Sequence, residues 1–240
     1  MAVPAASPPA ADSVVLVDER IDSRVSLPLV SRLLWSFLRW FFRYLYTSLA
    51  WSYDAVAWLS SLGQWEAWRR SALARTTAGA KVLEIGFGTG HLQVEASQAG
   101  VRIFGADASP QMVQIAARRL RLTGRTPRLA RAQAQALPFP SSSFPQVIAT
   151  FPSEYIFDPR SLGEIHRVLI AGGMLVVVFS ALIRPRFPWE RLTRWLYEQA
   201  GQSPGPDEKW LVPFRQACFH TRLEKVELPG ATVLHIIATT

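Results

Sequence analysis

Short apolar runs alternate with segments of helical periodicity from about residue 80 onward. The apolar runs predict buried strands over 82–85, 101–107, 145–151 and 174–179, and a hairpin over 221–228 and 232–238. Apolar positions that recur every three or four residues predict helices over 90–99, over 110–122 and from Asp158-Pro159 to Gly172-Gly173. Strands that alternate with helices in this way predict an α/β domain with a mainly parallel sheet.

The first 79 residues follow a different pattern. Residues 1–28 open with an Ala- and Pro-rich stretch that predicts a disordered or extended tail and lacks the features of a signal peptide. Residues 29–79 predict an N-terminal helical cap, in which 31–47 place arginines on one narrow stripe and Leu, Trp, Phe and Tyr elsewhere. An interfacial helix that contacts a membrane and a helix packed over the core both fit this segment. A membrane span is the least favoured alternative, because arginines interrupt the apolar run.

The composition limits the chemistry. The 240-residue chain has one cysteine, Cys218, which excludes an internal disulfide and fits a reducing, cytoplasmic location. No cluster of His, Asp and Glu suggests a metal, so none is expected. The net charge is +8, and six arginines occur between 118 and 131 without an acid anywhere in 108–153. This charge fits a phospholipid surface, RNA, a solvated helix face or simply an arginine-rich genome.

Three alternating glycines follow the first apolar run at once. Gly86, Gly88 and Gly90 form a G-x-G-x-G loop after Glu84, and a predicted helix begins where the loop ends. Glycine permits a tight turn and lets a ligand lie against the backbone, and the helix N-terminus offers free N–H groups. A dinucleotide fingerprint would read G-x-G-x-x-G, so the spacing disfavours an NAD-dependent oxidoreductase.

This loop resembles the first motif of the Rossmann-like (class I) S-adenosylmethionine-dependent methyltransferases, in the ubiquinone/menaquinone-biosynthesis-like group. The resemblance implies S-adenosyl-L-methionine as the cofactor, with its methionine moiety held by the loop. The residues of the loop motif that it assigns to cofactor binding are Glu84, Gly86, Phe87, Gly88 and Gly90.

An acid ends the second predicted strand. Asp107 follows Gly90 by 17 residues, where a doubly wound fold places a carboxylate that binds the ribose hydroxyls. The next residues match the family pattern D-x-S-x-x-M, which implies that Ala108 and Met112 also line the cofactor site, with Met112 on the adenine side.

A Leu-Pro-Phe loop at 137–139 resembles the third-strand motif of the same family. An acid–Ala pair precedes this loop in the family, whereas this chain has Gln133 and Ala134. The side-chain oxygen of Gln133 can accept a hydrogen bond from the adenine amino group, but it lacks the charge of a carboxylate. Pro145 and Ala171 are two further departures from the family pattern.

The end of the fourth strand is where acceptor substrates sit in the family. Thr150 and Phe151 are expected beside the cofactor, and Glu154 or Tyr155 could orient or deprotonate the nucleophile. Glu154 and Tyr155 are therefore candidates for catalysis and for substrate binding, with a loop carboxylate and a packing aromatic as the alternatives. Tyr53 in the cap is a further substrate candidate, or else it fills the seam between the cap and the core.

The resemblance implies a doubly wound, seven-stranded, mostly parallel sheet of order 3-2-1-4-5-7-6 over residues 80–240. It also implies a methyltransferase that depends on S-adenosylmethionine. The aromatic segment 31–47 and the basic residues favour a small or amphipathic acceptor, such as a quinone precursor or a lipid headgroup, at the inner face of the membrane.

Two other functions stay open. A degenerate, non-catalytic cofactor-binding or scaffold protein would explain Gln133, Pro145 and Ala171. An RNA methyltransferase is third, and nucleic acid is a disfavoured partner. The chain lacks the Asn/Asp-Pro-Pro-Tyr-type tetrapeptide that base-modifying members carry after the fourth strand.

Overall fold

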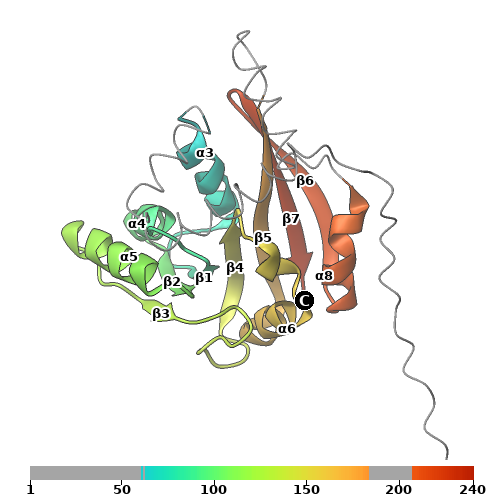
Figure 1. Ribbon diagram of the computed structural model, residues 1–240, viewed down its shortest axis with the longest axis horizontal. Helices are drawn as coiled ribbons and strands as arrows, with labels where there is room; N and C mark the ends of the chain where they lie inside the picture. The colour runs from blue at the N-terminus through green and yellow to red at the C-terminus, as the bar shows by residue number, and fades with distance from the viewer. Residues whose placement is uncertain (1–60, 62, 184–206) are drawn as a thin grey trace, which may run out of the picture. The chain divides into compact units, whose positions relative to one another are not determined.

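A seven-stranded sheet forms the centre of the part of the chain that the structure describes, residues 61, 63–183 and 207–240. The structure is a computed structural model. Strand order is β3-β2-β1-β4-β5-β7-β6 (Figure 1). Strands β1 to β5 pair in parallel, and β7 runs antiparallel to both of its neighbours. The predicted fold and strand order are confirmed. Tyr53, segment 31–47 and the predicted tail lie outside the described residues.

Most strands are bounded much as their apolar runs predict, but β5 extends beyond the predicted 174–179 at both ends. They span Lys81–Ile85 (β1), Arg102–Asp107 (β2), Leu129–Arg131 (β3), Phe144–Thr150 (β4), Leu169–Ile183 (β5), His220–Leu228 (β6) and Ala231–Thr239 (β7). The α-helices span Trp65–Arg70 (α3), His91–Gln98 (α4), Pro110–Leu122 (α5), Pro159–Val168 (α6) and Val212–Gln216 (α8). Short 3-10 helices span Ser71–Arg75 (η2), Glu154–Phe157 (η3) and Glu208–Leu211 (η4).

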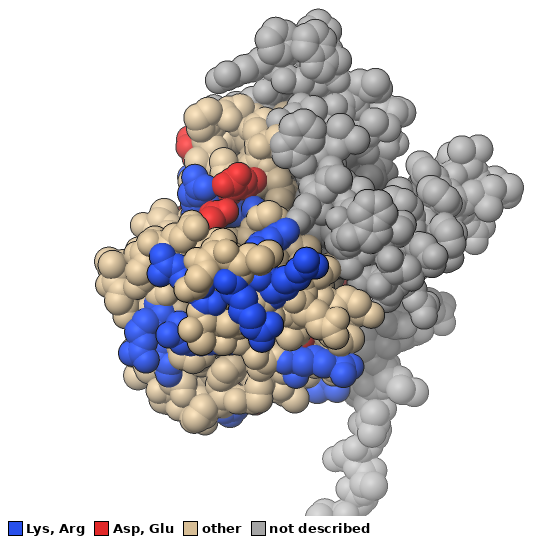
Figure 2. Space-filling model, turned by 90° about the vertical axis from the view of Figure 1, so that its left-hand side faces the viewer, with Lys and Arg blue, Asp and Glu red and all other residues tan. Residues whose placement is uncertain are grey.

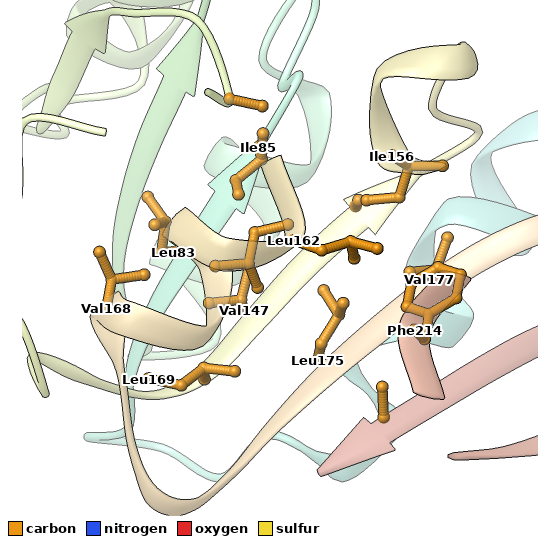
Figure 3. Close-up of a cluster of buried hydrophobic side chains, with 14 of the residues drawn as sticks. Leu83, Ile85, Val147, Ile156, Leu162, Val168, Leu169, Leu175, Val177 and Phe214 are labelled. Atoms are coloured by element: carbon orange, nitrogen blue, oxygen red, sulfur yellow. The ribbon is translucent and has the colours of Figure 1, made fainter. Parts of the chain in front are cut away.

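Both faces of the sheet carry helices. Residues of α3 and α4 pack on one face, and residues of α6 and α8 pack on the other (Figure 1). Successive strand residues point to opposite faces, so Val147 of β4 joins the cluster on the α6 side, whereas Ile148 joins the cluster on the α3 side. Figure 3 shows the α6 side, where Leu162 of α6 and Phe214 of α8 lie beside the strand residues Leu175 and Val177.

Two helices begin directly after a side chain that caps them. Ser109 precedes Pro110, and its hydroxyl accepts a hydrogen bond from the Met112 N–H at 3.3 Å. Asp158 precedes Pro159, and its carboxylate accepts from the Arg160 N–H at 2.9 Å. Each side chain accepts a hydrogen bond from an N–H group of the first turn that has no partner within the helix. Both helix starts therefore follow from local chemistry.

The end of α6 corrects a prediction. The helix was expected to continue to Gly172-Gly173, but it ends at Val168, and Leu169 is already extended. Leu169 pairs with Phe144 of β4, and the pairing then shifts register before Gln146 pairs with Met174. Strand pairing therefore takes Leu169 out of the helix, and the two glycines lie in the irregular part of β5.

Residues before β1 are fixed to the sheet by a buried histidine. His235 of β7 is fully buried, and its Nε2 lies 2.8 Å from the Ser71 hydroxyl of η2. Burial, followed by the charge of Arg75, lowers the pKa of His235 to about 4, against the opposite effect of Glu224. The imidazole is therefore neutral in the folded protein at neutral pH.

His235 should make the folded state sensitive to acid. Its pKa is about 4 in the folded protein and 6.5 in its ordinary state, so the unfolded chain takes up the proton first. Stability should fall by up to a few kcal/mol as the pH drops from about 6.5 to about 4. In His235→Gln, urea unfolding at several pH values should show a smaller loss over this range. His220→Gln, a change at an exposed histidine, should keep the wild-type slope. If the free energy of unfolding changed equally with pH in His235→Gln and in the wild type, this assignment would be contradicted.

Candidate functional site

The glycine loop joins the carboxyl end of β1 to the start of α4. All three glycines have positive φ, with +70° at Gly86, +55° at Gly88 and +81° at Gly90. A Cβ on Gly86 would lie 2.5 Å from the Tyr155 hydroxyl, and one on Gly90 would lie 2.5 Å from the Cβ of Ala116. A Cβ on Gly88 would meet nothing within 4 Å. Gly86 and Gly90 thus serve packing within the protein, and Gly88 is the glycine that a ligand can approach.

Asp107 lies at the carboxyl end of β2 and holds the glycine loop. Its Oδ2 accepts a hydrogen bond from the Gly88 N–H, and its Oδ1 accepts one from the Ser109 N–H, each at 2.9 Å. Burial raises the pKa of Asp107, and the two backbone hydrogen bonds oppose that shift. A carboxylate has about four acceptor positions, so Asp107 can still accept hydrogen bonds from a ligand that lies beside Gly88.

Glu84 lies behind the loop. Its side chain is fully buried in β1, and its Oε2 accepts a hydrogen bond from the Gln93 Nε2 of α4 at 2.7 Å. Burial raises the pKa of Glu84 to about 8, although Gln93 and then Arg69 act in the opposite direction. At neutral pH the carboxyl group is therefore mainly protonated. A contact between Glu84 and the cofactor stays a prediction, whereas its link between β1 and α4 is observed.

Two aromatic rings meet where β4 ends. Phe151 directly follows β4, and its ring stacks on that of Trp65 from α3, with 4.4 Å between the centroids and 25° between the planes. Phe151 has a φ of +46°, which is unusual for a residue with a side chain. Its N–H donates to the Val178 carbonyl of β5 at 2.8 Å. Both rings are half-buried, so the pair presents aromatic surface at the carboxyl end of the sheet.

Tyr155 lies at the same end of the sheet, on the α6 side. Its hydroxyl donates to the Ile85 carbonyl, the last of β1, at 3.2 Å. Glu154 precedes it in η3 and is exposed, and Thr150 is the last residue of β4. The structure therefore brings Thr150, Phe151 and Tyr155 to the end of β4 beside the glycine loop.

The other predicted cofactor residues differ in their exposure. Phe87 and Met112 are buried, and the Phe87 ring lies against Gly105 of β2. Ala108 and Gln133 are exposed, and Ala134 is buried. The roles of these residues toward the cofactor stay predictions. The side chains of Phe87 and Met112 contribute to packing around the site.

Comparison with known proteins decides the family. Residues 83–177 match the family described as a methyltransferase domain. The demethylmenaquinone methyltransferase of Symbiobacterium thermophilum is 32% identical to this chain over 228 residues, which cover 81% of this chain and 90% of that protein. The chain belongs to the class I S-adenosylmethionine-dependent methyltransferases.

A second relative and a solved structure agree with this class I family. The demethylmenaquinone methyltransferase of Thermus thermophilus is 37% identical over 139 residues, which cover 56% of this chain and 63% of that protein. A crystal structure of an S-adenosylmethionine-dependent methyltransferase from Aquifex aeolicus shares the fold, with a TM-score of 0.52 and 17% identity over 68% of this chain and 83% of that one. These comparisons do not support the non-catalytic scaffold or the RNA methyltransferase.

The described residues fit S-adenosylmethionine, the cofactor of this methyltransferase family. The open approach to Gly88 leaves room at the loop backbone, and Asp107 keeps acceptor positions beside that approach. Asp107 would hold the ribose hydroxyls, and the loop would hold the methionine part. Among the described residues, no group of three or more His, Cys, Asp or Glu side chains could hold a metal ion, and no helix is long and apolar enough to cross a bilayer.

Trp65 is a residue that sequence reasoning did not assign to the site. It lies 86 residues before Phe151 in the chain, so the contact depends on how α3 sits on the sheet. The signal that could have pointed to it is a tryptophan in the predicted helical cap, before the first strand.

Removal of the Asp107 carboxylate should weaken cofactor binding. Hydrogen bonds to charged groups contribute about 1.5–3 kcal/mol each, so Asp107→Ala should raise the Kd for S-adenosylmethionine by at least about tenfold. Isothermal titration calorimetry measures this change. Asp207→Ala removes an aspartate that caps η4 and should leave the Kd unchanged. An unchanged Kd in Asp107→Ala would remove Asp107 from the cofactor site.

Glu84 should make stability fall as the pH rises. Its pKa is about 8 in the folded protein and 4.5 in its ordinary state, so the folded protein keeps the proton that the unfolded chain loses. Stability should fall by up to a few kcal/mol between about pH 4.5 and about pH 8. Glu84→Gln lacks this titration, so the free energy of unfolding should depend less on pH there. Glu208→Gln changes an exposed glutamate of η4, outside the surroundings of Glu84, and is the matched control. Parallel pH profiles for Glu84→Gln and the wild type would refute the assignment.

Proposed function

We propose that this methyltransferase transfers the methyl group to a ring carbon of a demethylmenaquinol-like acceptor. The observation that carries the proposal is the similarity to the demethylmenaquinone methyltransferase of Symbiobacterium thermophilum, which extends over 90% of that protein. The relative from Thermus thermophilus carries the same name. Similarity that extends beyond the cofactor-binding half of the chain supports a shared class of acceptor.

The chemistry of such an acceptor sets what the site must do. S-adenosylmethionine supplies an electrophilic methyl group on a positively charged sulfur. A hydroquinone ring carbon becomes a good nucleophile when an adjacent ring hydroxyl loses its proton, and the ring carbon loses its own proton after methylation. The protein must therefore hold the ring flat against the donor and provide a route for protons.

The aromatic pair is suited to a flat acceptor. Trp65 and Phe151 stack with 4.4 Å between their centroids, and both keep exposed surface. Aromatic rings favour offset stacking on other aromatic rings. We assign these two residues to the acceptor ring, at the carboxyl end of β4, where Tyr155 also lies.

Tyr155 and Glu154 are the candidates for handling the acceptor's protons. The Tyr155 hydroxyl donates to the Ile85 carbonyl at the start of the glycine loop, which holds it between the cofactor loop and the end of β4. Glu154 is exposed next to it, so it could take a proton directly to water. The same proposal includes three predictions from the sequence. They are a cytoplasmic location, a contact of residues 31–47 with the inner face of a membrane, and a role of Tyr53 in substrate binding.

A direct assay tests the acceptor class. The full chain with labelled S-adenosylmethionine should methylate a water-soluble, short-chain demethylmenaquinol, and mass spectrometry should place the methyl group on a ring carbon. The reduced quinol should react and the oxidised quinone should not, because only the quinol carbon is nucleophilic. Asp107→Ala serves as the control for cofactor-dependent transfer. Label found only in phosphoethanolamine lipids or in RNA under the same conditions would overturn the quinol assignment.

Loss of the Trp65 ring should affect the acceptor more than the cofactor. An aromatic pair contributes about 0.5–1.5 kcal/mol, so Trp65→Ala should raise the KM for the quinol by roughly two- to twelvefold. The Kd for S-adenosylmethionine should not change. Trp210→Ala is the matched control, because Trp210 packs against Phe157 and Phe179 in a different cluster. An unchanged KM together with weaker cofactor binding would contradict the assignment of Trp65.

A further inference from the structure

Five exposed arginines and one exposed leucine lie along the outer side of α5 and the β3 edge of the sheet. We call this group the arginine surface. Its members are Arg118, Arg121, Leu122, Arg125, Arg128 and Arg131. The view in Figure 2 faces the side of the molecule on which α4 and α5 lie. Blue atoms are spread over the described part there, whereas the red atoms gather toward its top. The surface is therefore strongly positive and open to solvent.

The fold alone does not account for this charge. Arg121 lies in the last turn of α5, where a cation interacts favourably with the helix dipole. The Arg128 guanidinium lies over the Phe104 ring, 5.9 Å from its centroid, but Arg125 and Arg131 lie beyond the helix without such a contact among the described residues. None of the five arginines makes an ion pair with a carboxylate of the described residues. No acid occurs in residues 108–153. The arginines repel one another, so an anionic partner would stabilise them.

Leu122 indicates the nature of that partner. Its side chain is 78% exposed, the highest value among the large apolar residues of the described part. Leu122 follows Arg118 by one helical turn and so lies on the same outward side of α5. Surfaces that bind single-stranded RNA present aromatic rings on which bases stack, whereas a leucine among arginines matches headgroups beside an apolar layer. The observations therefore favour lipid over nucleic acid.

We infer that the arginine surface binds the anionic headgroups of a phospholipid membrane, with Leu122 inserted at the boundary of the acyl chains. The inference rests on the proposed function, since a menaquinol precursor is a lipid-soluble molecule. Arg131 pairs in register with Asp107 across β2 and β3. Arg131 thus lies at the end of the sheet that carries the cofactor site, whereas Arg121 and Leu122 lie in the last turn of α5, toward the other end of the strands.

Vesicle flotation of the full chain tests the arginine surface. Wild-type protein should float with vesicles that contain phosphatidylglycerol and not with pure phosphatidylcholine, and added salt should release it. Each basic residue near an anionic surface strengthens binding roughly fivefold, so Arg121→Glu/Arg125→Glu should lower the partition coefficient by more than about tenfold. Lys209→Glu/Lys225→Glu changes the net charge equally near the opposite edge of the sheet, at β6, and should bind nearly as the wild type does.

Leu122→Gln tests the apolar contact without any change of charge. It should weaken binding to the anionic vesicles by a few fold, and circular dichroism should show an unchanged fold because the side chain is exposed. Binding of polyuridylate that Arg121→Glu/Arg125→Glu abolishes, without binding to vesicles, would overturn the inference in favour of RNA. Vesicle binding that is equal in the arginine and lysine double variants would overturn it as well.

The quinol assay separates this inference from the proposed function. Both double variants should methylate the water-soluble, short-chain quinol at the wild-type rate, because the arginines lie outside the site. Methylation of this quinol without any vesicle binding would refute membrane binding by the arginine surface and leave the quinol acceptor in place. Specific vesicle binding without methylation would refute the quinol acceptor alone.

Discussion

The carboxylate of Asp107 holds the site together before any ligand binds. One of its oxygens accepts from Gly88 in the loop after β1, and the other accepts from Ser109 in the turn after β2. Two neighbouring connections of the sheet thus converge on a single charged group. Because the group is half-buried, both hydrogen bonds are stronger than they would be in water. The position of Gly88 and the turn before α5 both depend on this arrangement.

The fold could be predicted because its local signals agree with one another. The apolar runs marked the strands, and Ser109-Pro110 and Asp158-Pro159 marked two helix starts at the correct residues. The predicted end of α6 was wrong because the helical periodicity continues through Leu169. In the structure Leu169 pairs with Phe144 of β4, which is a contact between distant segments. Local pattern cannot show which of two such preferences prevails.

The candidate site was predictable to different degrees. Asp107 and the glycine loop follow from motif spacing, and the structure brings them into contact. The sequence could not show that Gly86 faces Tyr155 and Gly90 faces Ala116, because a glycine needed for packing and a glycine needed for a ligand have the same letter. Trp65 was missed as a partner of Phe151 for a related reason. The contact joins α3 to the residue after β4, and only the tertiary fold brings these two segments together.

The close approach of Tyr155 to Gly86 links two parts of the chain that differ in purpose. Gly86 belongs to the loop that we expect to hold the cofactor, whereas Tyr155 follows the strand that we assign to the acceptor. A larger residue at position 86 has no room while Tyr155 stays in place, and a smaller residue at position 155 would leave a gap above the loop. During divergence to new acceptors, these two positions cannot change independently. A change at position 155 to suit a new acceptor is therefore limited by the contact of that residue with position 86 in the glycine loop.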